Sequence, residues 1–149
     1  MRQIKFRAWD KEFEGGTMTY SDERLHLEDF FCYHEGQDLM QFTGLLDKNG
    51  KEIYEGDKCK FWYKIKEKVS PKELLIEQVL EVQYGFHEGN RGESSSFYGW
   101  LEIHDGYISP LEDRQKWTYQ NPYWDLIDWG YEIIGNIYEN PKILKIERR

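Results

Sequence analysis

The clearest pattern along the chain is a strict alternation of apolar and polar side chains over residues 58–66. Side chains two residues apart point to the same side of a β-strand, so this period predicts a strand with two different faces. The apolar face carries Cys59, Phe61, Tyr63 and Ile65. The opposite face carries Lys58, Lys60, Trp62, Lys64 and Lys66. The pattern therefore predicts one buried face and one basic face that holds a single tryptophan.

The stretch before this strand, residues 40–57, predicts a β-hairpin followed by a sharp turn. Its turn sequence, Asp47-Lys48-Asn49-Gly50, suits a type I turn in which the Asp side chain accepts backbone N–H groups and Gly50 takes positive φ in a bulge. A two-residue type I′ turn centred on Asn49-Gly50 is the competing register. Residues 55–57 form a second tight turn around a glycine, where a side chain would be costly.

The N-terminal region predicts a second hairpin. Ile4, Phe6 and Ala8 alternate with polar or amphipathic residues, residues 14–16 read as a turn, and residues 17–20 alternate again. Residues 24–34 begin with alternation and then break it with two adjacent phenylalanines, which predicts a strand with a bulge; a short helix is the alternative.

The middle of the chain changes period. Ser70 and Pro71 resemble an N-cap and a first helical residue, which predicts one or two helical turns through Gln78. Alternation from residue 80 to 86 then predicts a strand, while a single helix over residues 71–82 is the alternative. Residues 87–96 read as a loop, and residues 97–103 as a returning strand.

Residues 117–131 hold six aromatic side chains, and Asn121-Pro122 interrupts any continuous helix there. Packing in the core and a protein-binding surface are both compatible with this composition. Residues 131–137 alternate again, with Gly135 predicting a bulge or a sharp bend. Asn140-Pro141 predicts the start of a short final helix.

Composition places these elements in one domain. The chain has 149 residues, a formal net charge of −8 and 17% aromatic residues, which predicts a soluble, cytoplasmic, β-rich protein. No apolar run reaches the length of a membrane span, and no signal peptide is expected. The two cysteines, Cys32 and Cys59, lie in apolar surroundings and are expected to be buried, reduced thiols.

Side chains capable of catalysis are scattered. Cys32 and His34 alone do not supply the four ligands of a zinc site, and Asp125 with Asp128 is a weak acid pair beside stacking aromatics. No phosphate-binding loop or nucleophile motif is present. We therefore expect no enzyme, no metal and no cofactor; the alternative is an enzyme, such as a metal-dependent nuclease, whose acids converge only in the fold.

The basic face is the sharpest binding hypothesis. Lysines that flank an exposed tryptophan suit a groove for single-stranded nucleic acid, although the negative net charge disfavours that partner. The alternative is an outer strand that its lysines protect from edge pairing. The candidate partner-binding residues are Lys58, Lys60, Trp62, Lys64, Trp117, Trp124 and Trp129.

Three blocks of the sequence together resemble the YopX-like family of phage and prophage proteins: IKFRAWD at residues 4–10, MQFTGLLDKNGKEIYEGD at residues 40–57, and EIIGNIYENPKIL at residues 132–144. Residues 67–130 match less clearly and are expected to be an elaboration of this member. The resemblance implies a temperate phage of a Gram-positive bacterium and a family without an established activity.

The resemblance also implies the fold. We expect a mainly β, SH3-like small β-barrel with an N-terminal hairpin and one or two short helices, in a single domain over residues 1–149. Residues 39–66 and 131–144 are expected to form the barrel core. The expected function is that of a phage accessory protein that binds a host or phage protein in the cytoplasm of the bacterial host cell. A homo-oligomer is compatible with the sequence.

Overall fold

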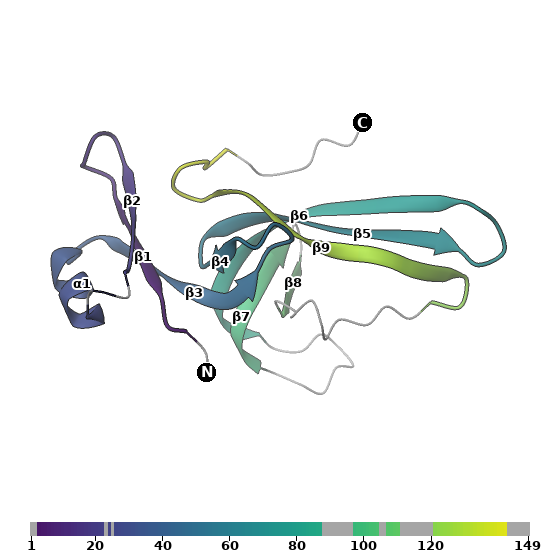
Figure 1. Cartoon of the computed structure of the whole chain (residues 1–149), viewed down its shortest axis with the longest axis horizontal. Coiled ribbons are helices and arrows are strands. Elements are labelled where there is room, and N and C mark those ends of the chain that lie inside the picture. Colours follow the sequence, from purple (N-terminus) through teal and green to yellow (C-terminus); the bar gives the residue numbers. More distant parts are fainter. Residues whose placement is uncertain are drawn as a thin grey trace.

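The structure is a computed structural model, and it describes residues 3–22, 24, 26–87, 97–104, 107–110 and 121–142. These residues form strands in two sheets and a short helix (Figure 1). The elements are β1 (Phe6–Asp10), β2 (Thr17–Tyr20), α1 (Leu27–Tyr33), β3 (Asp38–Leu46), β4 (Glu52–Tyr54), β5 (Asp57–Glu67), β6 (Glu73–His87), β7 (Phe97–His104), β8 (Tyr107–Pro110) and β9 (Trp124–Asn136). The prediction of a mainly β protein is confirmed.

The smaller sheet has the strand order β2-β1-β3-β4, and the larger sheet has the order β8-β7-β6-β5-β9. Figure 1 shows β1, β2 and α1 grouped at one end of the molecule, with β3 leading from them to the larger sheet, which curls into a half-barrel. The β5–β6 hairpin extends to the opposite end. In the described residues no helix is long and apolar enough to cross a membrane.

The hairpin and turn predicted for residues 40–57 are confirmed. Asp47 Oδ1 accepts the N–H groups of Asn49 and Lys51, and Gly50 has φ of 81°. Asn49 is not among the positive-φ residues, so the turn is type I with a following glycine and not type I′. Gly56 also has positive φ, 84°, in the second turn.

The two-faced strand over residues 58–66 is confirmed as the greater part of β5. Cys59, Phe61 and Ile65 are buried, and Cys59 and Phe61 belong to a hydrophobic core that includes residues of β6 and β9. The buried core cluster consists of Ile53, Cys59, Phe61, Leu80, Val82, Trp129 and Tyr131. Strands β4, β5, β6 and β9 thus share one core.

Strand β9 contains two irregularities in its pairing with β5. Its register shifts between the partners of Lys58 and Cys59, next to Gly135, and again between the partners of Lys64 and Ile65. The first shift confirms the bulge predicted at Gly135. Such shifts increase local twist and help the sheet to curl.

Two predicted elements are wrong. Residues 27–33 form helix α1 and not a bulged strand, because a helix buries Phe30 (2% exposed) and brings Phe31 edge-on to Phe6, with ring centroids 4.9 Å apart. Residues 73–87 form one strand without a preceding helix, because every residue from Glu73 to Glu81 pairs with β5.

Ser70, which suggested the start of a helix, lies in the hairpin turn between β5 and β6. Ser70 Oγ accepts the N–H of Lys72 and donates to Glu67, so the hydroxyl makes local bonds of the kind that an N-cap makes. The predicted loop at residues 87–96 and the final helix after Asn140-Pro141 lie almost entirely outside the described residues.

Candidate functional site

Strand β5, which carries the basic face, lies in the middle of the larger sheet between β6 and β9. The interpretation of this segment as an outer strand that lysines protect from edge pairing is therefore wrong. Hydrogen bonds to two neighbouring strands occupy both of its edges. The lysines must have another role.

Carboxylates flank these lysines on both sides. Lys60 Nζ lies 3.7 Å from Glu77 of β6 and 3.3 Å from Glu132 of β9. Lys58, itself buried, lies 4.0 Å from Glu81. In register, Lys66 lies between Glu73 and Asp125, and Asp128 lies beside Lys64. The face thus holds more carboxylates than lysines on β5, so its positive charge is neutralised within the sheet.

Trp62 lies half-buried at the centre of this face. Lys48, from the turn between β3 and β4, holds its ammonium group 5.5 Å from the centroid of the indole ring. Across the strand pair, Gly130 leaves space for the ring, since a Cβ there would come within 3.4 Å of it. Within the described part of the chain, the buried indole Nε1 has no hydrogen-bond partner. The ring therefore packs against the protein on one side and under a lysine on the other.

The turn that carries Lys48 also binds the outer edge of β9. Lys48 N–H donates to the carbonyl of Tyr131 at 2.8 Å, and Asp47 Oδ2 accepts the N–H of Ile133 at 3.1 Å. Lys48 and Lys60 both pair with Glu132, and these neighbours hold the pKa of its carboxyl below the ordinary value against the effect of desolvation. Ion pairs on the basic face thus link the turn between β3 and β4 to β5 and β9.

The other candidate aromatics have different environments. Trp129 is buried (7% exposed) and packs edge-on against Phe61 and Tyr131 in the core. Trp124 is half-buried at the start of β9, and Trp117 lies outside the described residues. Only Trp124 of these three is thus placed by the structure where a partner could reach it.

The candidate catalytic residues do not converge. Asp125 pairs with Lys68 at 3.5 Å, and Asp128 accepts the N–H of Trp129, so each is engaged on β9. His34 Nδ1 lies 2.7 Å from Gln37, and Cys32 is exposed, which corrects the prediction that it is buried. The two cysteines do not form a disulfide, and Cys59 is buried as predicted. Among the described residues, no three potential ligands group into a metal site.

A buried ion pair that the sequence analysis did not identify joins the two sheets. Arg7 of β1 pairs with Asp57 of β5, and the guanidinium lies over the ring of Tyr54 at 4.9 Å. Asp57 Oδ2 also accepts the N–H of Tyr54. Burial raises the pKa of Tyr54 to about 12, with the charge of Glu52 adding to the effect. The alternation of residues 4–9 had placed Arg7 on the polar face, and no local signal marks its partner.

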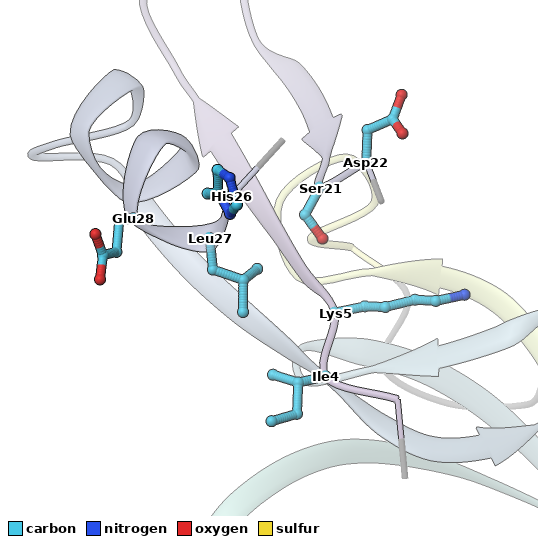
Figure 2. A pocket seen from close by; sticks show the side chains of 7 residues that line it. All are labelled: Ile4, Lys5, Ser21, Asp22, His26, Leu27 and Glu28. Atoms are coloured by element: carbon cyan, nitrogen blue, oxygen red, sulfur yellow. The ribbon is translucent and has the colours of Figure 1, made fainter. Parts of the chain in front are cut away.

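A cavity of about 570 Å³ lies beside this pair, lined among others by Tyr20, Tyr54, Asn136 and Asn140. A second, of about 740 Å³, lies between the N-terminus of α1 and the ends of β1 and β2. In Figure 2, Leu27 and Ile4 extend toward the space between them, while Glu28 and Asp22 point away. The larger cavity is also lined by Ser21 and His26, but Ser21 Oγ accepts the N–H of Phe6 and Asp22 Oδ1 accepts that of Arg24, so these oxygens are engaged by the backbone.

Exposed apolar residues occur at the turn between β5 and β6 and on the segment joined to it. Val69 is 90% exposed at the tip, and Tyr123 is 72% exposed on the adjoining segment. The two segments are joined because Lys68 N–H donates to the carbonyl of Tyr123 at 2.9 Å. Leu74, opposite Ile65 at the same end, is 38% exposed. We call Val69, Leu74, Tyr123 and Trp124 the apolar tip.

The match to a family model agrees with the resemblance in the sequence. The family model described as YopX protein matches residues 5–145. Among solved structures, the crystal structure of protein EF1440 from Enterococcus faecalis is similar, with 20% identity, a TM-score of 0.41, and coverage of 97% of this chain and 99% of that chain. No curated protein matches the sequence.

Proposed function

The chain belongs to the YopX protein family, and from this premise we propose that it is an accessory protein that acts by binding another protein and not by catalysis. The observation that carries this proposal is the apolar tip. Large apolar side chains at a projecting end of a soluble domain lose unfavourable contact with water when a partner covers them. Tyr and Trp are also enriched at protein interfaces.

The geometry of the tip suits an apolar groove on a partner. Val69 lies in the turn between β5 and β6. The aromatic residues Tyr123 and Trp124 lie on the adjoining segment, where Lys68 bonds to Tyr123 and Glu67 pairs with Trp124. Lys68 pairs with Asp125 at the rim, where both side chains are about half-exposed and contribute little to stability. An apolar centre with a charged rim is the arrangement of a protein-binding patch.

The alternative, a barrel that binds single-stranded nucleic acid, has less support. Such binding draws most of its free energy from neutralised phosphates. On the β5 face, Lys58 and Lys60 already have carboxylate neighbours, and Trp62 is covered by Lys48. A phosphate backbone would have to displace these neighbours.

The family resemblance supports the remaining parts of the proposal. We propose a phage or prophage protein that works in the cytoplasm of the bacterial host, with the half-barrel as the counterpart of an SH3-like barrel. The partner is a host or phage protein that offers an apolar groove.

Photo-crosslinking tests the role of the apolar tip. A crosslinking amino acid at position 69 is expected to capture one protein from host cells, and Val69→Asp with Tyr123→Ala is expected to abolish that capture from a probe at position 74. A probe at Leu46, which is 54% exposed on β3, is the control and should capture nothing specific. The proposal would be contradicted if the tip variant captured as much protein as the unmodified tip. It would also be contradicted if the protein bound single-stranded DNA and the tip substitutions left that binding unchanged.

A further inference from the structure

The outer strand of the smaller sheet, β2, differs from the edge strands β9 and β4 in how its backbone is protected. On β9, the Asp47 side chain and the Lys48 N–H bind outward-facing groups of Ile133 and Tyr131, and Asp128 accepts the N–H of Trp129. These bonds block the edge against another strand. Strand β4 has only three residues, and Asp57 and Thr43 bind its Tyr54 N–H and Ile53 carbonyl.

Among the described residues, no side chain or turn bonds to the outward-facing backbone groups of β2. Its sequence, Thr-Met-Thr-Tyr, contains no charge and no proline, and its register with β1 is regular over all four residues. β-Branched and aromatic residues of this kind favour pairing. In the described residues β1 is its only strand neighbour. Because natural sheets usually block such an edge, an unblocked one indicates a binding edge.

The hydrogen bonds show which backbone groups face outward. Ser21 N–H donates to the carbonyl of Phe6 at 2.8 Å, and Ser21 continues the register of β2 with β1. In an antiparallel pair, alternate residues bond to the same neighbour. Thr19 therefore points its backbone groups toward β1, and Met18 and Tyr20 point theirs away from it.

We infer that β2 pairs with β2 of a second copy of this chain, antiparallel and about a two-fold axis at Thr19. This surface is distinct from the apolar tip, so the inference goes beyond the proposed function. In this register Met18 and the partner's Tyr20 exchange backbone hydrogen bonds, and the axis repeats the exchange. Registers centred on Met18 or on Tyr20 would also pair outward groups, but the first places Tyr20 opposite the partner's Gly16, and the second places Met18 opposite the partner's Asp22, beyond the end of the strand.

Side chains favour the register at Thr19. Tyr20 is 52% exposed, and in the dimer its ring would lie beside the thioether of the partner's Met18, a favourable sulfur–aromatic pair. Thr19 is exposed and would face the partner's Thr19 in a cross-strand pair. A second copy therefore supplies the groups that the edge lacks, which is why we choose it over a foreign strand.

The shortness of β2 determines the strength of the dimer. Four paired residues bury less than the roughly 1,200 Å² of a standard stable interface. The dimer is therefore expected to be weak and to form in a concentration-dependent manner. Two four-stranded sheets would join into one continuous sheet across the axis.

Sedimentation velocity over a concentration series tests the inference. The unmodified chain should shift from monomer toward dimer as concentration rises. Thr19→Lys places two ammonium groups opposite each other at the axis and should leave only monomer, and Thr19→Glu should do the same with two carboxylates. An equimolar mixture of the two variants should restore the dimer, because lysine then faces glutamate.

The mixture separates loss of pairing from loss of folding, since misfolded variants would not recover together. Gln83→Lys, which adds the same charge at an exposed position of β6, is the matched control and should dimerise like the unmodified chain. A chain that stays monomeric at all concentrations would overturn the inference. A dimer that Thr19→Lys leaves intact, or a mixture of variants that stays monomeric, would also overturn it.

Discussion

Arg7 and Asp57 form an ion pair in the protein interior, with Arg7 Nη2 2.8 Å from Asp57 Oδ1 and side chains that are 3% and 2% exposed. Arg7 comes from the first of the three sequence blocks and Asp57 from the end of the second. Asp57 lies opposite Asn136, which belongs to the third. Since these blocks meet at one buried pair, we interpret the pair as the junction that fixes the smaller sheet on the larger one.

Removing one partner of this pair should destabilise the fold strongly. Asp57→Ala leaves the Arg7 guanidinium buried without its carboxylate, and we expect a loss of about 3–5 kcal/mol in the free energy of unfolding. Urea denaturation measures this loss. The double variant Arg7→Met with Asp57→Leu removes both charges and should be more stable than Asp57→Ala. A double variant that is less stable than the single one would show that the pair itself is not the source of the cost.

The pH dependence of stability should report Glu55, the residue before Gly56. Burial raises the pKa of the Glu55 carboxyl above its ordinary value, although a hydrogen bond with the Gln41 backbone and the charge of Arg7 oppose the shift. Because the folded-state pKa is the higher one, the stabilisation from protonation is complete below the unfolded pKa and is lost as pH rises through the folded pKa.

Glu55→Gln removes this ionisation, so comparing this variant with the unmodified chain isolates the effect of the Glu55 carboxyl. The free energy of unfolding of the unmodified chain, minus that of Glu55→Gln, should fall as pH rises from about 4 to about 7. Urea denaturation at several pH values gives both quantities. A difference that rises with pH would mean that the folded protein stabilises the charged form.

The turn glycines allow a comparison between strain and steric contact. Gly50 has φ of 81° with open space where a Cβ would lie, so Gly50→Ala should cost only the left-handed strain, about 1–2 kcal/mol. Gly56 has a similar φ, but a Cβ there would lie 3.3 Å from Met40 Sδ and 3.4 Å from Ile137. Gly56→Ala should therefore cost more than Gly50→Ala in thermal or urea denaturation. Equal losses would indicate that Met40 and Ile137 move aside freely.

Local patterns predicted the parts of this fold that local interactions determine. The alternation over residues 58–66 gave both faces of β5, and Asp47 with Gly50 gave the turn, because each depends on residues close in the sequence. Ser70 misled the prediction because a hydroxyl that accepts a nearby N–H serves a helix N-cap and a hairpin turn alike. Alternation over residues 80–86 predicted the second half of β6, but the first half is determined by its pairing with β5, which no local pattern contains.

The candidate site was less predictable for a related reason. The lysines of β5 were identified correctly as one face, but their neighbours come from three separate segments: Lys48, Glu77 and Glu132. Charge compensation across strands depends on register, and register cannot be read from one strand. The Arg7–Asp57 pair is hidden for the same reason, since each residue stands in a sequence that also suits an exposed side chain.

The two faces of β5 can be compared in a single pair of substitutions. Phe61 is 9% exposed and contacts the rings of Tyr63, Trp129 and Tyr131, so Phe61→Ala should cost about 3–5 kcal/mol as a large-to-small change in the core. Trp62 is only half-buried, between Gly130 and Lys48, and Trp62→Ala should cost about 1–2 kcal/mol from lost apolar burial. Urea denaturation of both variants gives the comparison. Trp62→Phe keeps one aromatic ring but removes part of the indole together with its N–H, which has no hydrogen-bond partner among the described residues, so it should cost less than Trp62→Ala. A loss for Trp62→Ala as large as that for Phe61→Ala would mean that the Lys48-covered face is a second core.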